Sequence, residues 1–407
     1  MNEKKNNFIP YGRHYIDQSD IDAVTAVLKD GMLTQGPKVD EFENSIAKKV
    51  NAKYAIAVSS ASAALHLACM VLKIDSSNIC ITSVNTFVAS ANCAEYQGAK
   101  TLFCDIEEDS LNMCPKDLKK KISQFPAIKL IIPVHFSGVA SNMEEISEIA
   151  KKNDSYIIED ASHALGGYYP NGEPVGSCIY SEMTVFSLHP VKGVTAGEGG
   201  VITTNNKDFA GLLKQLRSHG ICKGNFDLPG ISVGDDTIIN KEAALEDGKL
   251  NPWYYEMQNL GYNYRITDIQ CALANSQLKK IERFIERKKE IVQKYDKFFK
   301  NTELLTLTQK DYRKISSLHL YVIRINFKKL KISRRQLMNK LFEEGIGTQV
   351  HYIPIPLHPF YANKGLLLSD FPAMENYYNE ALSIPLYYGL NDDLVDNVCK
   401  SILNKLI

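Results

Sequence analysis

One lysine of the sequence has neighbours that would allow it to act as an amine nucleophile. Lys192 follows the strand-like run Met183–Leu188 and precedes Gly193–Gly200, a segment with four glycines in eight residues. A lysine amine held away from water has a lowered pKa and can form a Schiff base with an aldehyde cofactor. A loop lysine is more often simply solvated. The cofactor interpretation therefore depends on whether other residues supply a cofactor site.

A serine-rich turn is the first candidate for such a site. Ser60 and Ser62 lie in Ser59–Ala63, between the strand-like run Tyr54–Val58 and a helical pattern. Small residues let a ligand approach the backbone, and the first N–H groups of a helix attract phosphate. An ordinary serine N-cap has the same residues. The GxxxxGK[ST] and GxGxxG motifs of nucleoside triphosphate and dinucleotide sites are absent.

An acid and an aromatic residue extend this set. Asp160 follows the strand-like run Tyr156–Glu159, and the carboxyl ends of parallel strands are where open α/β sheets bind ligands. Its carboxylate could pair with a protonated ring nitrogen, or it could be a strand-end cap. Phe87 follows another strand and could stack on a flat ring, although such a residue alone is more often core. Together with Lys192 and the serine turn, these residues are the set needed to hold pyridoxal phosphate.

A histidine- and proline-containing segment, His351–His358, lies near the carboxyl terminus. Its proline spacing forbids a helix. The segment lacks HExxH geometry, so we expect no metal site there. We interpret it as a rigid loop that presents polar side chains to a ligand.

The elements that must position these residues alternate along the first part of the chain. Ser19 is expected to cap one helix and Pro37 to open a second, and other helical patterns occur near residues 86–97, 115–123 and 142–152. Alternation of apolar strands with helices predicts an α/β domain with a mostly parallel sheet. The expected strands are Tyr54–Val58, Ile79–Ser83, Thr101–Cys104, Leu130–His135, Tyr156–Glu159, Thr184–Leu188 and Val201–Thr204.

The second part of the chain has a different pattern. A charged, glycine-containing stretch, Cys222–Tyr255, predicts a long surface excursion. One long helix is expected from Thr267 to about Lys300, followed by a smaller α+β domain with two helices near its end. A chain of 407 residues exceeds the usual size of one core, so we expect a large domain over 1–265 and a linker helix and small domain over 266–407. The other expected elements of the small domain are strand Leu320–Asn326, helix Arg334–Glu344 and strand Thr348–Tyr352.

Composition excludes several classes of partner. Lys plus Arg and Asp plus Glu both total 47, so the formal net charge is zero, which argues against nucleic acid and anionic membrane. The nine cysteines contain no CxxC pair, so we expect buried thiols rather than disulfides or zinc. Met1–Asn7 leads into no apolar core, and no apolar run is long enough to span a bilayer. These features predict a soluble, cytoplasmic protein.

The motifs resemble those of the DegT/DnrJ/EryC1/StrS sugar aminotransferase family, a branch of the fold-type I pyridoxal-phosphate enzymes. The resemblance runs nearly end to end, and two motifs, Ser187–Gly200 and Gly261–Gln270, are highly specific to it. Asn251–Tyr255 and Gln349–Pro354 are similar to one subgroup. That subgroup aminates C4 of a UDP-4-keto-6-deoxy-N-acetylhexosamine in pseudaminic acid biosynthesis. Further shared segments are Tyr11–Arg13, Leu33–Pro37 and Ser383–Leu386.

The resemblance implies a role for each site residue. Lys192 would bind the cofactor aldehyde, Asp160 would pair with the pyridine nitrogen, Phe87 would stack on the ring and His163 would lie near the ring hydroxyl. The phosphate would be held by Ser62, which stands where the family often has threonine, by the Ala63 amide and Ser187, and by Asn263 of a second subunit. The residues implied to line the nucleotide-sugar cleft are Tyr11, Thr34, Ala61, Arg265, His351 and Tyr352.

The implied reaction is a two-step transfer with one lysine serving both halves. Glutamate, the family's usual donor, would give its amine to the cofactor and leave as 2-oxoglutarate, and the sugar would then accept the amine. Some family members are dehydratases with histidine at the lysine position, so Lys192 favours a transaminase. Alternatives are another nucleotide 4-keto sugar, such as a bacillosamine or legionaminic precursor, and a cofactor-bound regulatory protein. A homodimer with shared active sites is expected.

Overall fold

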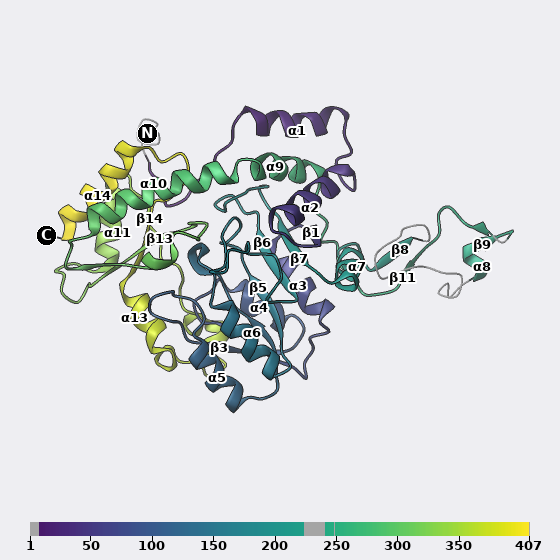
Figure 1. The fold of residues 1–407 in the computed structure, drawn as a ribbon, viewed down its shortest axis with the longest axis horizontal. Coiled ribbons are helices and arrows are strands. Elements are labelled where there is room, and N and C mark those ends of the chain that lie inside the picture. Colours follow the sequence, from purple (N-terminus) through teal and green to yellow (C-terminus); the bar gives the residue numbers. More distant parts are fainter. Residues whose placement is uncertain (1–7, 224–240, 248, 407) are drawn as a thin grey trace.

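A seven-stranded sheet lies at the centre of the structure, a computed structural model that describes residues 8–223, 241–247 and 249–406 (Figure 1). Its strand order is β1-β7-β6-β5-β4-β2-β3. Only β7 runs antiparallel to its neighbours, which confirms the prediction of a mostly parallel sheet. The strands are β1 (Tyr54–Val58), β2 (Ile79–Ser83), β3 (Lys100–Cys104), β4 (Ile128–Ile132), β5 (Tyr156–Asp160), β6 (Met183–Ser187) and β7 (Gly200–Thr204).

Alternate residues of these strands enter two separate apolar cores. Ile157 packs into one core and Ile158 into the other, because successive side chains of a strand point to opposite faces. One face is covered by α3 (Ala61–Val71), α4 (Ala89–Glu95) and α7 (Lys207–Leu216). The opposite face is covered by α2 (Pro37–Lys49), α5 (Pro115–Gln124), α6 (Met143–Lys152) and α9 (Asp268–Leu278).

A three-stranded antiparallel sheet forms a second, smaller unit. Its order is β12-β13-β14, with β12 at Leu305–Leu307, β13 at Tyr321–Ile325 and β14 at Ala381–Ile384. Helices α10 (Ile281–Phe299), α11 (Arg334–Glu343) and α14 (Asp392–Leu406) share one apolar core with this sheet. The short helices α12 (Pro359–Ala362) and α13 (Pro372–Glu380) precede β14. The division of the chain at residue 265 stays a prediction.

Three expectations for individual elements are wrong. The predicted long helix is two helices, α9 and α10, because α9 packs on α1 (Gln18–Asp30) and α2 whereas α10 packs on α14. The expected strand 348–352 makes a single bridge, between Gln349 and Ser383, before the chain turns toward a cavity. Asp17 rather than Ser19 caps α1, because its carboxylate accepts the Ser19 amide.

The excursion predicted over 222–255 is described in part, since residues 224–240 and 248 lie outside the described ranges. Its described residues form an arm that extends away from the central sheet (Figure 1). We define the arm by residues 221–223, 241–247 and 249–257. It contains β8 (Ile221–Lys223), α8 (Lys241–Ala244), β9 (Leu245–Glu246), β10 (Lys249–Leu250) and β11 (Tyr255–Met257).

The first described residues pack against the smaller unit. Ile9 donates its amide to Gly345 O and accepts from the Gly347 amide, both at 2.8 Å. Leu386 N donates to Tyr11 O at 3.0 Å, which brings the aminoterminal segment beside β14.

All nine cysteines are free thiols, and all but Cys114 are buried, as predicted. No helix in the described ranges is long and apolar enough to cross a membrane.

The two-faced core predicts a position-dependent effect on stability. Ile146 of α6 is fully buried, so Ile146→Ala should lower the free energy of unfolding by about 2–5 kcal/mol. Ile21 of α1 is 50% exposed, so Ile21→Ala should change it by no more than about 0.5 kcal/mol. Urea unfolding of both variants measures the difference, and equal losses would contradict this packing.

Candidate active site

A cavity of about 390 Å³ opens at the carboxyl edge of the central sheet. Strands β5 and β6 end at its wall, and the turn after β1 closes one side. Its roof comes from the aminoterminal segment and from the smaller unit. The predicted site residues that line it are Tyr11, Ala61, Ser62, Phe87, Asp160, His163, Ser187, Lys192, His351 and Tyr352.

Four predicted site residues do not line this cavity. Thr34 is exposed and bridges Thr267, and Arg265 is half-buried and bridges Val58. Asn263 is exposed and bridges Ser218. The Ala63 amide already donates to Ser60 Oγ at 3.1 Å, as the cap of α3.

Lys192 reaches the cavity without an internal partner for its amine. In the part of the chain that the structure describes, no hydrogen bond or ion pair to Nζ of Lys192 is formed. Burial lowers the pKa of Lys192 to about 8, while the nearby Asp160 acts in the opposite direction. At neutral pH the amine is still mostly protonated, but its uncharged form, which attacks carbonyl carbons, is far more populated than that of a solvated lysine.

Asp160 is held in one orientation at the end of β5. Ser90 Oγ donates to its Oδ2 at 2.5 Å, and the Ser162 amide donates to its Oδ1 at 3.0 Å. The side chain is buried, with 5% exposed. Oriented in this way, the carboxylate can accept a hydrogen bond from a protonated ring nitrogen. Its negative charge would then keep that nitrogen in the charged form.

Beneath Asp160 lies a second, fully buried carboxylate, that of Glu159. His135 Nε2 and Tyr169 Oη each lie 2.7 Å from Glu159 Oε2, and Ser181 Oγ donates to Oε1 at 2.5 Å. Desolvation would raise the pKa of Glu159, but these hydrogen bonds outweigh it and lower the pKa. Since the His135 amide also donates to Asp160 O at 3.0 Å, this network fixes the backbone that carries Asp160.

His163 connects the sheet to the cavity roof. The Ser137 amide donates to His163 Nδ1 at 3.2 Å, and His163 Nε2 lies 2.9 Å from Tyr352 Oη. Burial and the positive charge of Lys192 lower the pKa of His163 well below its usual value, so the ring is neutral. Because Nδ1 accepts, Nε2 carries the proton and donates to Tyr352, whose own hydroxyl proton is free to donate elsewhere.

The serine turn depends on a glycine of the neighbouring strand. A Cβ on Gly200 of β7 would lie 2.5 Å from the carbonyl carbon of Ser60 and 2.6 Å from the Ala61 nitrogen. Glycine at this position allows the turn to lie directly over β7. The hydroxyl of Ser62 and the first turn of α3 then face the cavity, a geometry suited to phosphate.

Several residues at the site were missed by the sequence analysis. Ser90 orients Asp160 from α4, and His319 lies over His163 with ring centroids 4.2 Å apart. Thr86, His189 and Glu198 also line the cavity. Glu198 lies inside the recognised Lys192 motif, so its position offered a signal, whereas Ser90 and His319 come close only through the tertiary fold.

The pKa of Lys192 predicts how its reactivity depends on pH. The rate at which trinitrobenzenesulfonate modifies Lys192 in the cofactor-free protein should rise with a midpoint near pH 8 and then level off, because the neutral amine is the reactive form. Peptide mass spectrometry follows the modified site. A model lysine peptide, with a pKa of about 10.4, should keep rising to higher pH. The same profile for Lys192 and the peptide would contradict the desolvated environment.

Known proteins share this arrangement of sequence and fold. A transaminase of Campylobacter jejuni, named UDP-4-amino-4,6-dideoxy-N-acetyl-beta-L-altrosamine transaminase, is 40% identical over 387 residues, 94% of this chain and 93% of the relative. The structure of Helicobacter pylori PseC, an aminotransferase involved in the biosynthesis of pseudoaminic acid, has a TM-score of 0.86 at 29% identity, covering 98% of this chain and 99% of PseC.

A second similar structure is the PLP-form of the putative sugar aminotransferase Spr1654 from Streptococcus pneumoniae, with a TM-score of 0.84 and 26% identity over 98% of this chain and 100% of Spr1654. The model of the DegT/DnrJ/EryC1/StrS aminotransferase family matches residues 14–403. The chain therefore belongs to the DegT/DnrJ/EryC1/StrS aminotransferase family.

Proposed function

We propose that the protein is a pyridoxal-phosphate-dependent aminotransferase that moves an amino group from glutamate to C4 of a UDP-4-keto-6-deoxy-N-acetylhexosamine, in pseudaminic acid biosynthesis. The observation that carries this proposal is the desolvated amine of Lys192, which has no hydrogen-bond or ion-pair partner among the described residues and shares one cavity with Asp160 and the serine turn. The Campylobacter transaminase and PseC support the choice of sugar.

The residues of the cavity fit the cofactor. Ser62 and the amino end of α3 offer hydrogen-bond donors for a phosphate, and Asp160 offers an oriented carboxylate for a ring nitrogen. Phe87 lines the cavity with 58% of its surface exposed, which leaves a ring face available for stacking. The volume of about 390 Å³ lies within the range of roughly 300–1,000 Å³ common for ligand pockets.

Lys192 and Asp160 divide the catalytic work. Pyridoxal phosphate supplies an aldehyde for the amine and a ring that accepts an electron pair from the donor's α-carbon. Lys192 would hold the cofactor covalently and, once displaced by the donor amine, would take the proton from the donor's α-carbon as general base and deliver it as general acid to the former aldehyde carbon. Asp160 keeps the ring nitrogen protonated throughout. The same two residues serve the sugar half-reaction in the reverse order.

Residues from the roof are proposed to bind the sugar. Tyr11, His351 and Tyr352 face the cavity from the aminoterminal segment and the smaller unit. His351 is held by Ser383 Oγ, 2.8 Å from its Nδ1. Thr34 and Arg265 lie outside the lining, so we assign them to the part of the nucleotide sugar that extends beyond the cavity mouth.

A homodimer would complete the site. Asn263 does not reach its own cavity, so its proposed contact with the phosphate requires a second copy of the chain. The arm and residues 258–262, which we call the arm base, expose a run of large apolar side chains, an unusual feature for a surface that stays free. These residues are Trp253, Tyr255, Met257, Leu260 and Tyr262, with exposed fractions of 69%, 56%, 63%, 76% and 39%.

A cytoplasmic location stays a prediction.

The reaction is tested by offering glutamate with several nucleotide 4-keto sugars. We expect amination of the UDP-sugar on the pseudaminic acid route, and loss of at least about 10³-fold in turnover for Lys192→Ala, since one group serves as both anchor and proton carrier. Product mass spectrometry and 2-oxoglutarate release measure both. Unchanged turnover in the variant would refute the role of Lys192, and preference for a dTDP-sugar or the epimer leading to bacillosamine would refute the choice of sugar.

The dimer is tested by a charge placed on the apolar arm base. Leu260→Asp should convert a dimer into monomers in analytical ultracentrifugation and lower activity in parallel, because a buried unpaired carboxylate is costly. Leu367→Asp is the matched control, since Leu367 is 60% exposed but lies in the smaller unit. A fully active wild-type monomer would contradict the shared site.

A further inference from the structure

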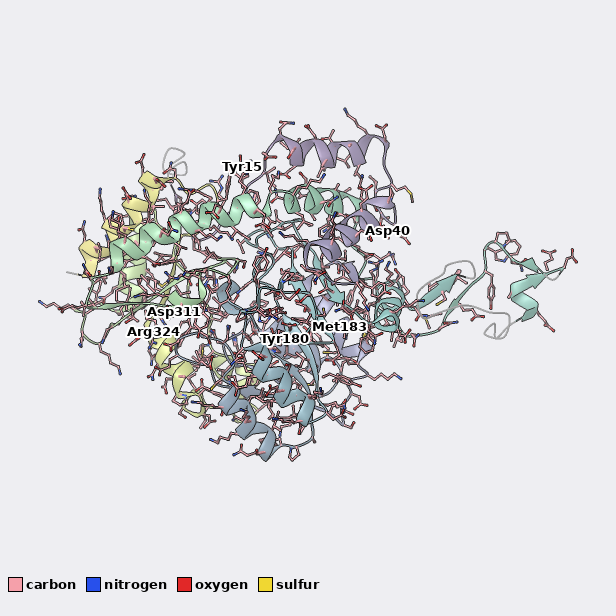
Figure 2. The ribbon with its side chains drawn as sticks, in the orientation of Figure 1. Tyr15, Asp40, Tyr180, Met183, Asp311 and Arg324 are labelled. Atoms are coloured by element: carbon pink, nitrogen blue, oxygen red, sulfur yellow. The ribbon has the colours of Figure 1, made fainter. Side chains whose placement is uncertain are left out.

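A small second cavity adjoins the first through Lys192. It has a volume of about 40 Å³ and shares Val191, Lys192 and His319 with the larger cavity. Its remaining walls come from the aminoterminal segment, from α9 and α10, and from the chain after β14. Figure 2 shows Tyr15, one of these wall residues, beside α10.

The second cavity contains a buried lysine that lacks a carboxylate partner. Lys288 of α10 is only 7% exposed, and its amine donates to Ser317 O at 2.8 Å. Within the described ranges, Lys288 forms no ion pair with an acidic side chain. An ammonium group has three N–H donors, and burying its charge without an opposite charge is costly. Burial lowers the pKa of Lys288 to about 8, which still leaves most of the amine charged at neutral pH.

Acidic side chains of the surrounding elements are already paired. On α10 itself, Glu282, Glu286 and Glu290 pair with Lys49, Lys289 and Arg287. Asp17 and Asp20 of the aminoterminal segment both pair with Lys280. Arg13, His14 and His319, which also line the cavity, add positive or neutral groups. Among the described residues no carboxylate therefore compensates the charge of Lys288, and we assign that role to a ligand.

The size of the cavity limits that ligand. A water-sized atom needs about 10–15 Å³ of such space, so a volume of about 40 Å³ holds about three non-hydrogen atoms. A carboxylate group has three, whereas a phosphate group has five. An amino donor must place its amine at Lys192, and its α-carboxylate is bonded to the same carbon as that amine, so both groups stay in the larger cavity. A second carboxylate, further along the donor, is the group that can extend into a neighbouring cavity.

We propose that the second cavity is a carboxylate subsite, in which Lys288 binds the side-chain carboxylate of a dicarboxylic amino donor. This inference rests on the proposed transaminase function. Lys288 is a binding residue for the donor and has no part in the chemical step. Its ammonium group gives the site a preference for glutamate over donors with an apolar side chain.

The test compares Lys288→Met with the neighbouring variant Lys289→Met, because Lys289 is only half-buried and pairs with Glu286. The holoenzyme should bind glutarate, a dicarboxylate without an amine, more tightly than butyrate in isothermal titration calorimetry. Lys288→Met should weaken glutarate binding by about 10- to 100-fold, the loss of one charge-assisted hydrogen bond, and leave butyrate unchanged. It should raise the KM for glutamate by a similar factor while leaving kcat/KM for alanine unaltered. Lys289→Met should behave as the wild type.

The outcomes separate this inference from the function on which it rests. If the wild type transaminates but Lys288→Met keeps its glutarate affinity and glutamate KM, the subsite is refuted and the proposed function stands. If no sugar is aminated while glutarate still binds through Lys288, the proposed reaction fails and the carboxylate site stands. Should Lys288→Met fail to fold, the wild-type comparison decides, because equal affinities for glutarate and butyrate would also refute the subsite.

Discussion

The structure keeps the amine of Lys192 out of water without giving it a carboxylate partner, and the rest of the site depends on that constraint. A solvated amine would stay protonated, and an ion-paired amine would be held in its charged form. The cavity avoids both states. Lys192 lies after β6, Asp160 lies at the end of β5 on the neighbouring strand, and no hydrogen bond joins the two side chains in the described structure. Asp160 is instead engaged by Ser90 and the Ser162 amide.

Sheet topology brings these residues together. Because β7 runs antiparallel between β1 and β6, the carboxyl ends of β1, β5 and β6 lie at one edge of the sheet. The serine turn, Asp160 and Lys192 meet there, although the turn and the lysine are far apart in the sequence. The backbone of the serine turn approaches β7 most closely at Gly200, where any side chain would displace the turn. The sheet thus brings the proposed phosphate turn, Asp160 and the proposed nucleophile together from three strand ends.

Much of this could be predicted from the sequence, because the information was local. Short apolar runs between helical patterns predicted the strands of the central sheet, and the motif around Lys192 was specific enough to indicate a family. Residues that reach the site through tertiary contacts could not be found in this way. Ser90 is an ordinary small residue of α4, and His319 lies next to His163 only because Ser317 and Ser137 link the two units of the chain.

Weak local signals also explain the wrong expectations. The three- and four-residue strands β12 and β14 are too short to show a period, and the expected strand over 348–352 forms only one bridge. The break between α9 and α10 contains no proline or glycine, and it follows from the different helices on which the two halves pack. The roles of the individual site residues remain proposals that the geometry supports.

Reduction of the purified protein with sodium borohydride, followed by peptide mass spectrometry, tests the assignment of the covalent anchor most directly. Borohydride converts a lysine Schiff base into a stable pyridoxyl label at the residue that held the cofactor. We expect a single label, on the peptide that contains Lys192. A label on Lys288 or another lysine, or no label on a protein that is active with bound cofactor, would contradict the central role of Lys192.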